Sequence, residues 1–188
     1  MYQVNPDILP RLAQQHADRR REGARGQLLL VLAGLEPHSS AVTADASDRA
    51  ALLEAVAERL RNSVRGHDMV IQRADGEFLL ALVDCLPEQA AFRLSKLLTA
   101  VGDQPIEVAG RSVDVVLAAG AATLPDAPAD DAAAQRTGID AALARASAAL
   151  FAARARGSDR AVLVFDGVES VVGHPLVAGG FTEIPRSA

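Results

Sequence analysis

The sequence lacks several features that would point at once to a class of protein. It has no tryptophan, and aromatic residues make up only 3% of its 188 residues, so an apolar core has to consist mainly of Leu, Val and Ala. The single cysteine, Cys85, excludes an internal disulfide and any metal site built from several cysteines. No apolar run approaches the ~20 residues that a membrane span needs, and the polar N-terminus has no signal-peptide pattern. We therefore expect a cytoplasmic protein without a membrane span.

The charge balance gives no sign of a nucleic-acid or lipid partner. The chain has 19 basic and 24 acidic residues, a net charge of −5, so it has no general affinity for phosphate-rich surfaces. The run Arg19–Arg21 has no interleaved aromatics, and we interpret it as a solvated helix face. The histidines, His38 among them, have no clustered partners in the sequence, and we interpret them as surface residues rather than metal ligands.

The chain is long enough for one domain, and its 49% hydrophobic content is ample for a core. Two apolar runs between Arg65 and Cys85 flank Asp75-Gly76, and such a pair of residues between strand-like runs is a strong hairpin signal. Apolar periodicity predicts further helices and strands on either side. The expected helices are 7–21, 47–61, one that begins at 87 and is broken by residues 102–105, and 139–156. The expected strands are 27–33, 68–73, 77–83, 106–108, 112–118 and 161–165.

Two segments have no regular pattern. Residues 125–137 are rich in Ala, Asp and Pro and are expected to form a mobile loop, and the chain beyond Gly167 is expected to pack loosely or act as a linker. The order of the remaining elements is β-α-β-β-α-β(β)-α-β. It predicts an α/β (α+β) fold with a mixed central sheet, in which a ferredoxin-like βαββαβ core is surrounded by helices.

Four stretches, in order, resemble the GGDEF domain of diguanylate cyclases, which condense two GTP into cyclic di-GMP. They are the helix RAALLEAVAERLRNSVRGHD (49–68), the hairpin QRADGEF (72–78), the strand AAGAA (118–122) and the late helix ASAALFAARARGSD (146–159). The resemblance covers about residues 5–166 and implies a GGDEF, nucleotidyl-cyclase-like fold. It implies an N-terminal helix or linker at 1–26, a degenerate GGDEF domain at 27–166 and a C-terminal tail at 167–188.

The chain departs from the family pattern where the family binds its catalytic metal. The signature itself is vestigial, consisting here of Ala74, Asp75, Gly76, Glu77 and Phe78. The family's first metal-binding Asp falls on Ala33 or, with a one-residue shift that aligns Glu36 with a second acidic position, on Gly34. The metal-binding acidic residue of the signature falls on Gly76. Because magnesium needs hard oxygen ligands, Glu77 alone is a poor site, and we expect no catalytic residues and no bound metal.

The positions that read guanine in the family are also changed. The family's guanine-reading Asn falls on Ala41 or, with the same shift, on Val42, and its guanine-reading Asp falls on Ala50. Arg154 falls where the family has a phosphate-contacting Lys, but without a metal we interpret it, like Arg73, as an exposed charge. The resemblance therefore implies a domain without cyclase activity.

One family motif is retained. Arg65-Gly66-His67-Asp68 forms an RxxD that ends five residues before the vestigial signature, which is the spacing of the family's inhibitory, product-binding site. A guanidinium can contact guanine or phosphate, and a carboxylate can accept from guanine N–H groups. An Arg at a helix end and an Asp before a strand are equally ordinary turn chemistry.

Two hypotheses follow. In the first, the domain is a receptor that binds cyclic di-GMP through Arg65 and Asp68. In the second, it is an interaction or dimerisation module in cyclic di-GMP signalling that has no ligand and acts through a protein partner or a second copy of itself.

Overall fold

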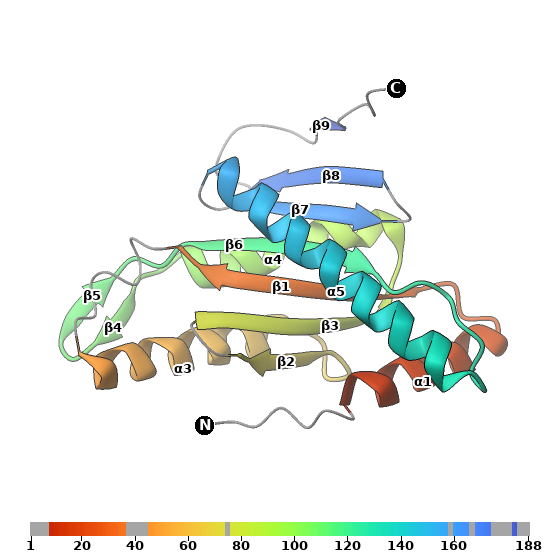
Figure 1. Ribbon diagram of the computed structural model, residues 1–188. Helices are drawn as coiled ribbons and strands as arrows, with labels where there is room; N and C mark the ends of the chain where they lie inside the picture. The colour runs from red at the N-terminus through yellow and green to blue at the C-terminus, as the bar shows by residue number, and fades with distance from the viewer. Residues whose placement is uncertain are drawn as a thin grey trace.

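A computed structural model describes residues 8–36, 45–73, 76–157, 160–165, 168–173 and 182–183 (Figure 1). Helices alternate with strands along most of this length. In chain order the elements are α1 (Ile8–Arg21), β1 (Gln27–Leu35), α3 (Ala46–Ser63), β2 (Met69–Gln72), β3 (Glu77–Cys85), α4 (Pro87–Gly102), β4 (Ile106–Val108), β5 (Arg111–Val113), β6 (Leu117–Thr123), α5 (Ala132–Ala155), β7 (Arg160–Phe165), β8 (Val168–Gly173) and β9 (Thr182–Glu183).

The main sheet is mixed. Its strand order within the described residues is β2-β3-β1-β6-β7-β8-β9. β1 lies in the middle, antiparallel to both β3 and β6, and β6 is parallel to β7. The unit from β1 to β6 has the ferredoxin-like arrangement, and the crossover through α5 adds the parallel strand β7. The predicted fold class is confirmed.

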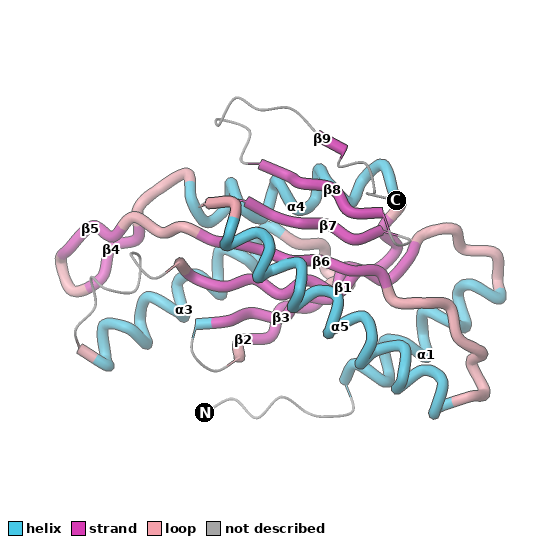
Figure 2. The backbone as a smooth tube through the Cα atoms, turned by 45° about the horizontal axis from the view of Figure 1, so that its top comes forward, coloured by secondary structure: helices cyan, strands magenta, loops and turns pink. Residues whose placement is uncertain are grey.

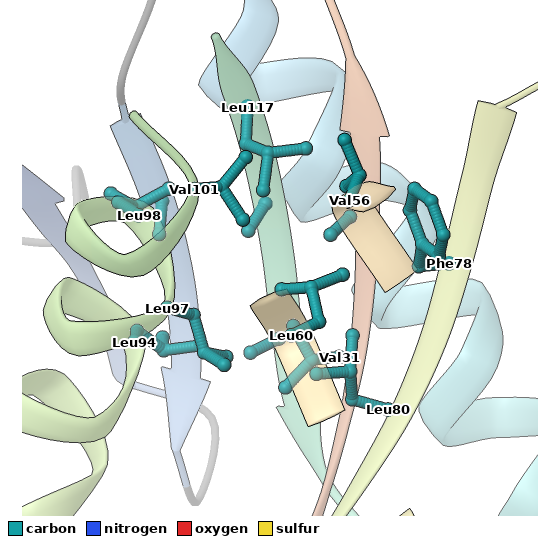
Figure 3. Close-up of a cluster of buried hydrophobic side chains, with 14 of the residues drawn as sticks. Val31, Val56, Leu60, Phe78, Leu80, Leu94, Leu97, Leu98, Val101 and Leu117 are labelled. Atoms are coloured by element: carbon teal, nitrogen blue, oxygen red, sulfur yellow. The ribbon is translucent and has the colours of Figure 1, made fainter. Parts of the chain in front are cut away.

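Helices cover both faces of this sheet (Figures 1 and 2). Alternate residues of β1 point to opposite faces, as they do in any strand. Val31 and its neighbours on the same face pack with α3 and α4, as the close-up of Val56, Leu60 and Leu94 shows (Figure 3). Leu30 and Leu32 face α1 and α5 instead. Because β1 is covered on both faces, it is a continuous apolar run rather than an alternating one.

Helix α5 lies directly on β6, and a glycine permits this approach. A Cβ added at Gly120 would overlap the backbone of α5 at Ala146 and Leu150, and it would lie 2.7 Å from the carbonyl carbon of Ala149. Backbone atoms inside a helix cannot move aside. The alanine-rich sequence of α5 and the glycine in β6 together explain why helix and sheet pack so closely.

The predicted hairpin is confirmed, and Gly76 at the end of its turn has the positive φ that favours glycine. β2 pairs with β3 in antiparallel register, and the Arg73 N–H donates to the Glu77 carbonyl across 2.7 Å. Gly76 has a φ of +78°, in the left-handed region that favours glycine. Ala74 and Asp75 lie outside the described residues.

The predicted strand 112–118 is wrong. β5 ends at Val113 and pairs only with β4 in a separate small sheet, whereas β6 begins at Leu117. The turn of this small hairpin lies at Ala109-Gly110, both with positive φ. The apolar run across 113–118 hides the break, because Val113 is buried in the same core as the main sheet.

Two segments expected to be irregular contain regular structure. α5 begins at Ala132, not 139, because the Asp131 side chain accepts from the Ala134 N–H across 2.8 Å and caps a run of alanines. The tail expected from residue 167 contains β8, which extends the sheet by pairing with β7 over its full length.

Candidate functional site

The vestigial signature lies where β1 ends and β3 begins, beneath the C-terminal part of α5. Ala33 is 3% exposed, pairs with Phe78 across the sheet and faces the core under α3 and α4. Gly34 pairs with Glu77 and faces α5, where an added Cβ would overlap the Arg154 guanidinium and lie 3.2 Å from its Cζ. Neither position offers a side-chain oxygen.

Four charged side chains meet at this end of the sheet, two from α5 and β3 and two from the segments that follow β1 and β2. Arg154 of α5 lies between two carboxylates, with its Nε 3.6 Å from Glu36 Oε1 and its Nη1 4.0 Å from Glu77 Oε1. Arg73 lies 3.8 Å from the other oxygen of Glu77. The formal charges of these two arginines and two glutamates therefore sum to zero. The sequence interpretation of Arg154 and Arg73 as merely exposed charges is incomplete, because both face carboxylates of the site.

The remaining signature positions that the structure describes contribute no further carboxylate. Phe78 is fully buried in the core, and Gly76 is buried with no side chain. Ala50 is exposed on α3, and Ala41 and Val42 lie outside the described residues. Within the described part of the chain, no group of three or more His, Cys, Asp or Glu side chains could hold a metal ion.

The retained RxxD motif forms the turn between α3 and β2, and its aspartate is a structural hub. The Asp68 Oδ2 accepts from the Arg65 N–H across 2.8 Å, and its Oδ1 accepts from the Val83 N–H across 2.9 Å. The Arg93 guanidinium donates to Oδ2 and also to the Val83 carbonyl. The Asp68 side chain is 0% exposed, and both of its carboxylate oxygens already accept hydrogen bonds within the protein.

The local backbone explains why an aspartate stands there. The register between β1 and β3 shifts after Leu82, where Asp84 takes a φ of +49°. β2 begins at Met69, opposite Ala81, so Val83 has no partner in that strand. The Asp68 carboxylate takes the Val83 N–H in place of a strand carbonyl. Burial also raises the pKa of the neighbouring Cys85 thiol, and Cys85 packs in the core.

Arg65 itself is exposed, at the edge of a cavity of about 270 Å³ between the end of α3 and α4. The cavity is also lined by Phe92, Arg93 and Lys96 of α4. Phe92 is 69% exposed, which is unusual for a chain with few aromatics. Sequence reasoning missed these three residues. Their spacing, with Gln89, is i, i+3, i+4, i+7, which places them on one helix face and is the signal that finds them.

One histidine contradicts its sequence interpretation. His16 of α1 is only 3% exposed and is not a surface residue, because α1 packs against α5 and the segment after β6 covers its ring. The arginines that follow it make ion pairs with other elements: Arg19 with Asp84 at 2.9 Å and Arg20 with Asp126 at 2.9 Å. The predicted solvated face is exposed as expected, since the Arg19 and Arg21 side chains are 45% and 57% exposed, but its arginines also tie α1 to the rest of the domain.

Comparisons with known proteins agree with this architecture. Residues 43–160, more than half of the chain, match the family model "Diguanylate cyclase, GGDEF domain". No curated protein matches. No helix among the described residues is long and apolar enough to cross a membrane.

Three solved structures illustrate the likeness. The GGDEF domain of FimX from Pseudomonas aeruginosa has 26% identity and a TM-score of 0.62, over 80% of this chain and 86% of that one. The active GGEEF domain of a Vibrio cholerae diguanylate cyclase has 16% identity and a TM-score of 0.62, over 82% and 93%. The diguanylate cyclase SiaD of P. aeruginosa, solved in complex with its activator SiaC, has 20% identity and a TM-score of 0.63. The match covers 84% of this chain but only 56% of the SiaD chain.

Proposed function

The chain belongs to the GGDEF diguanylate cyclase family, and we propose that it is a catalytically inactive member that binds cyclic di-GMP at the cavity beside Arg65. The observation that carries the proposal is the set of side chains around this cavity: three cations, Arg65, Arg93 and Lys96, with the exposed ring of Phe92. A GGDEF domain of this kind is a cytoplasmic receptor for the messenger rather than a source of it.

The chemistry of the cavity suits one half of a purine dinucleotide. The planar fork of Arg65 matches a phosphate or the O6 and N7 acceptors of guanine, and Lys96 adds a second charge for phosphate. An exposed aromatic ring offers a surface on which a base stacks. At about 270 Å³ the cavity is slightly smaller than typical small-molecule sites of ~300–1,000 Å³, so one base and a phosphate enter and the rest lies over α4.

Asp68 has a positioning role in this proposal rather than a direct contact. Its carboxylate already accepts from the Arg65 backbone and from Arg93. It therefore fixes the turn that presents the Arg65 side chain. The hypothesis that both residues of the motif contact the ligand is refined in this way: Arg65 contacts the ligand, and Asp68 fixes the turn that positions Arg65.

The proposed loss of cyclase activity rests on the charges at the vestigial signature. Magnesium bridges phosphate oxygens only where carboxylates leave a net negative charge for it. Here Glu36 and Glu77 are balanced by Arg73 and Arg154, and position 34 has no side chain. A sensitive assay for cyclic di-GMP formation from GTP with magnesium or manganese is expected to give no product, and turnover would refute this part of the proposal.

Calorimetric titration with cyclic di-GMP tests the receptor proposal. Wild type should bind, and Arg65→Ala or Lys96→Ala should weaken binding by about tenfold or more, the value of one charge-assisted hydrogen bond. Phe92→Ala should weaken it through lost stacking. Arg136→Ala, an exposed arginine on α5, is the matched control and should bind like wild type. A wild type without heat or thermal shift at high ligand concentration would sink the proposal.

A second candidate function is a protein-interaction module, favoured by one further aromatic side chain. Phe151 of α5 is 77% exposed, and an exposed phenyl ring of this kind is common at protein interfaces. The similar cyclase SiaD was solved with a protein activator. Light scattering of wild type against Phe151→Ser tests for a homodimer: a larger species that Phe151→Ser dissociates supports it, and a wild-type monomer excludes self-association through this ring.

A further inference from the structure

A second cavity lies between α1 and the segment that joins β6 to α5. It measures about 520 Å³, almost twice the cavity at Arg65, and it lies on the opposite face of the sheet. In Figure 1, α1 and the first turns of α5 lie side by side at this corner of the molecule. Much of its wall is apolar, including Ala13, Ala17 and Leu124.

The polar part of the wall is basic. Arg20, Arg21 and Arg25 line the cavity, and Asp126 is its one acidic lining residue. Arg20 is paired with Asp126, and Arg21 is 3.3 Å from Asp130 outside the lining. Arg25 is exposed and has no hydrogen bond or ion pair within the described residues. The cavity therefore has about one uncompensated positive charge.

A buried histidine forms another part of the wall. Neither ring nitrogen of His16 has a hydrogen-bond partner among the described residues, and its Nε2 lies 3.8 Å from Asp126 Oδ1, too far for one. Buried polar groups are almost always hydrogen-bonded, so an unpartnered imidazole beside a cavity indicates a missing partner. Burial lowers the pKa of His16 despite the nearby Asp126, so the ring is neutral and offers one N–H and one acceptor.

We propose that this cavity binds a small organic monocarboxylate with a short apolar body. Arg25 pairs with the carboxylate, the His16 N–H donates to it from the inner wall, and the apolar body packs against Ala13, Ala17 and Leu124. A single uncompensated charge matches a monoanion. Asp126, in contact with Arg20, disfavours a dianion such as phosphate.

The structure also shows what holds the cavity in shape. The Gln135 side-chain amide, 6% exposed, donates to the carbonyls of Pro128 and Ala129 at 3.0 and 3.1 Å and to Gln14 Oε1 at 3.0 Å. These bonds tie the segment before α5 to both helices. The space is therefore bounded by a fixed wall rather than by a loose loop.

The test is a titration of the protein with hexanoate, followed by heteronuclear NMR and calorimetry, with hexanol and inorganic phosphate in parallel. Hexanoate should shift the amide resonances of α1 and of residues 124–129. Hexanol and phosphate should each bind about tenfold or more weakly than hexanoate, because each lacks one half of the required chemistry.

Variants make the test specific. Arg25→Gln, at an exposed position, should weaken hexanoate about tenfold or more, and His16→Gln, checked for an unchanged fold by circular dichroism, should weaken it as well. Arg49→Gln on α3 is the matched control and should bind like wild type. Hexanoate that leaves α1 unshifted, or that binds Arg25→Gln as tightly as wild type, would overturn the proposal, and so would phosphate binding as tightly as hexanoate. Cyclic di-GMP binding should be the same in Arg25→Gln and wild type, so this proposal and the receptor proposal fail separately.

Discussion

Replacement of Asp68 by alanine separates a structural role from a ligand role. The RxxD pattern alone places Asp68 in a solvent-facing ligand site, where its loss would change stability little. The structure instead shows a carboxylate with no exposed surface that accepts from two backbone N–H groups and from Arg93. Asp68→Ala should therefore destabilise the fold strongly.

The magnitude follows from the partner left behind. Arg93 is only 10% exposed, and its loss of Asp68 leaves a guanidinium largely buried beside an unpaired Val83 N–H. Removal of one partner of a buried ion pair costs about 3–5 kcal/mol, because the other charge stays desolvated. We expect Asp68→Ala to lower the free energy of unfolding by about this amount, a large part of the ~5–15 kcal/mol typical of a domain.

Urea denaturation followed by far-UV circular dichroism measures the effect. Asp68→Asn keeps the shape and one acceptor oxygen and should lose less than Asp68→Ala. The double variant Asp68→Ala with Arg93→Met removes both charges and should recover part of the loss. Asp140→Ala, an exposed aspartate on α5, is the control and should change stability by less than about 0.5 kcal/mol. If Asp68→Ala lowers the free energy of unfolding by less than about 1 kcal/mol, the structural role is refuted and Asp68 becomes a candidate for direct ligand contact again.

Three further predictions concern packing, titration and a helix end. Gly120→Ala should lower the free energy of unfolding by about 3 kcal/mol or prevent folding, because the new Cβ would overlap the Leu150 backbone. Gly66→Ala, where the new Cβ meets no neighbouring atom, should be nearly neutral, and melting curves of both variants check this. Burial lowers the pKa of His16, so the unfolded chain takes up a proton first and stability should fall as the pH drops below about 6.5; urea midpoints at pH 7.5 and 5.5 should differ less in His16→Gln than in wild type. Arg59 donates to the carbonyls of Val101 and Pro105 at 2.9 and 2.6 Å, so Arg59→Ala should lower stability by about 1–2 kcal/mol in urea denaturation, with Arg49→Ala as the unaffected control.

Local patterns predict most of the fold because they report local causes. Apolar periodicity gives α3 and α4, Asp45 caps α3 with its side chain accepting from the Ser47 N–H, and Gly76 supplies the left-handed residue of the hairpin. The errors arise where tertiary contacts decide. The run from Val113 to Leu117 has no glycine or proline at its break, only Asp114, and β8 becomes a strand because the edge of β7 is available to it.

The site is harder to predict because its partners are distant in the sequence. Asp68 and Arg93 are 25 residues apart, and no local pattern shows that they meet. His16 is buried only because a segment more than 100 residues later folds over it. The RxxD spacing predicts Arg65 at a ligand site. Whether the carboxylate of Asp68 is available to a ligand depends on the register shift in β3, which leaves the Val83 N–H for Asp68 to accept from.

Two features at the vestigial signature, the missing side chain at position 34 and the arginine that faces it, bear on the proposed loss of catalysis together. An acidic residue restored at position 34 would meet the Arg154 guanidinium before it met a metal ion, because a Cβ there already overlaps that side chain. Arg154 is flexible enough to move, but the new carboxylate would pair with it, as Glu36 and Glu77 do now. Restoring a metal site therefore needs at least two changes, a carboxylate at the end of β1 and the removal of the arginine above it. Position 34 has no side chain, and the Arg154 guanidinium occupies the space that a side chain there would need. The proposed loss of catalysis therefore follows from this pair of residues as well as from the altered signature.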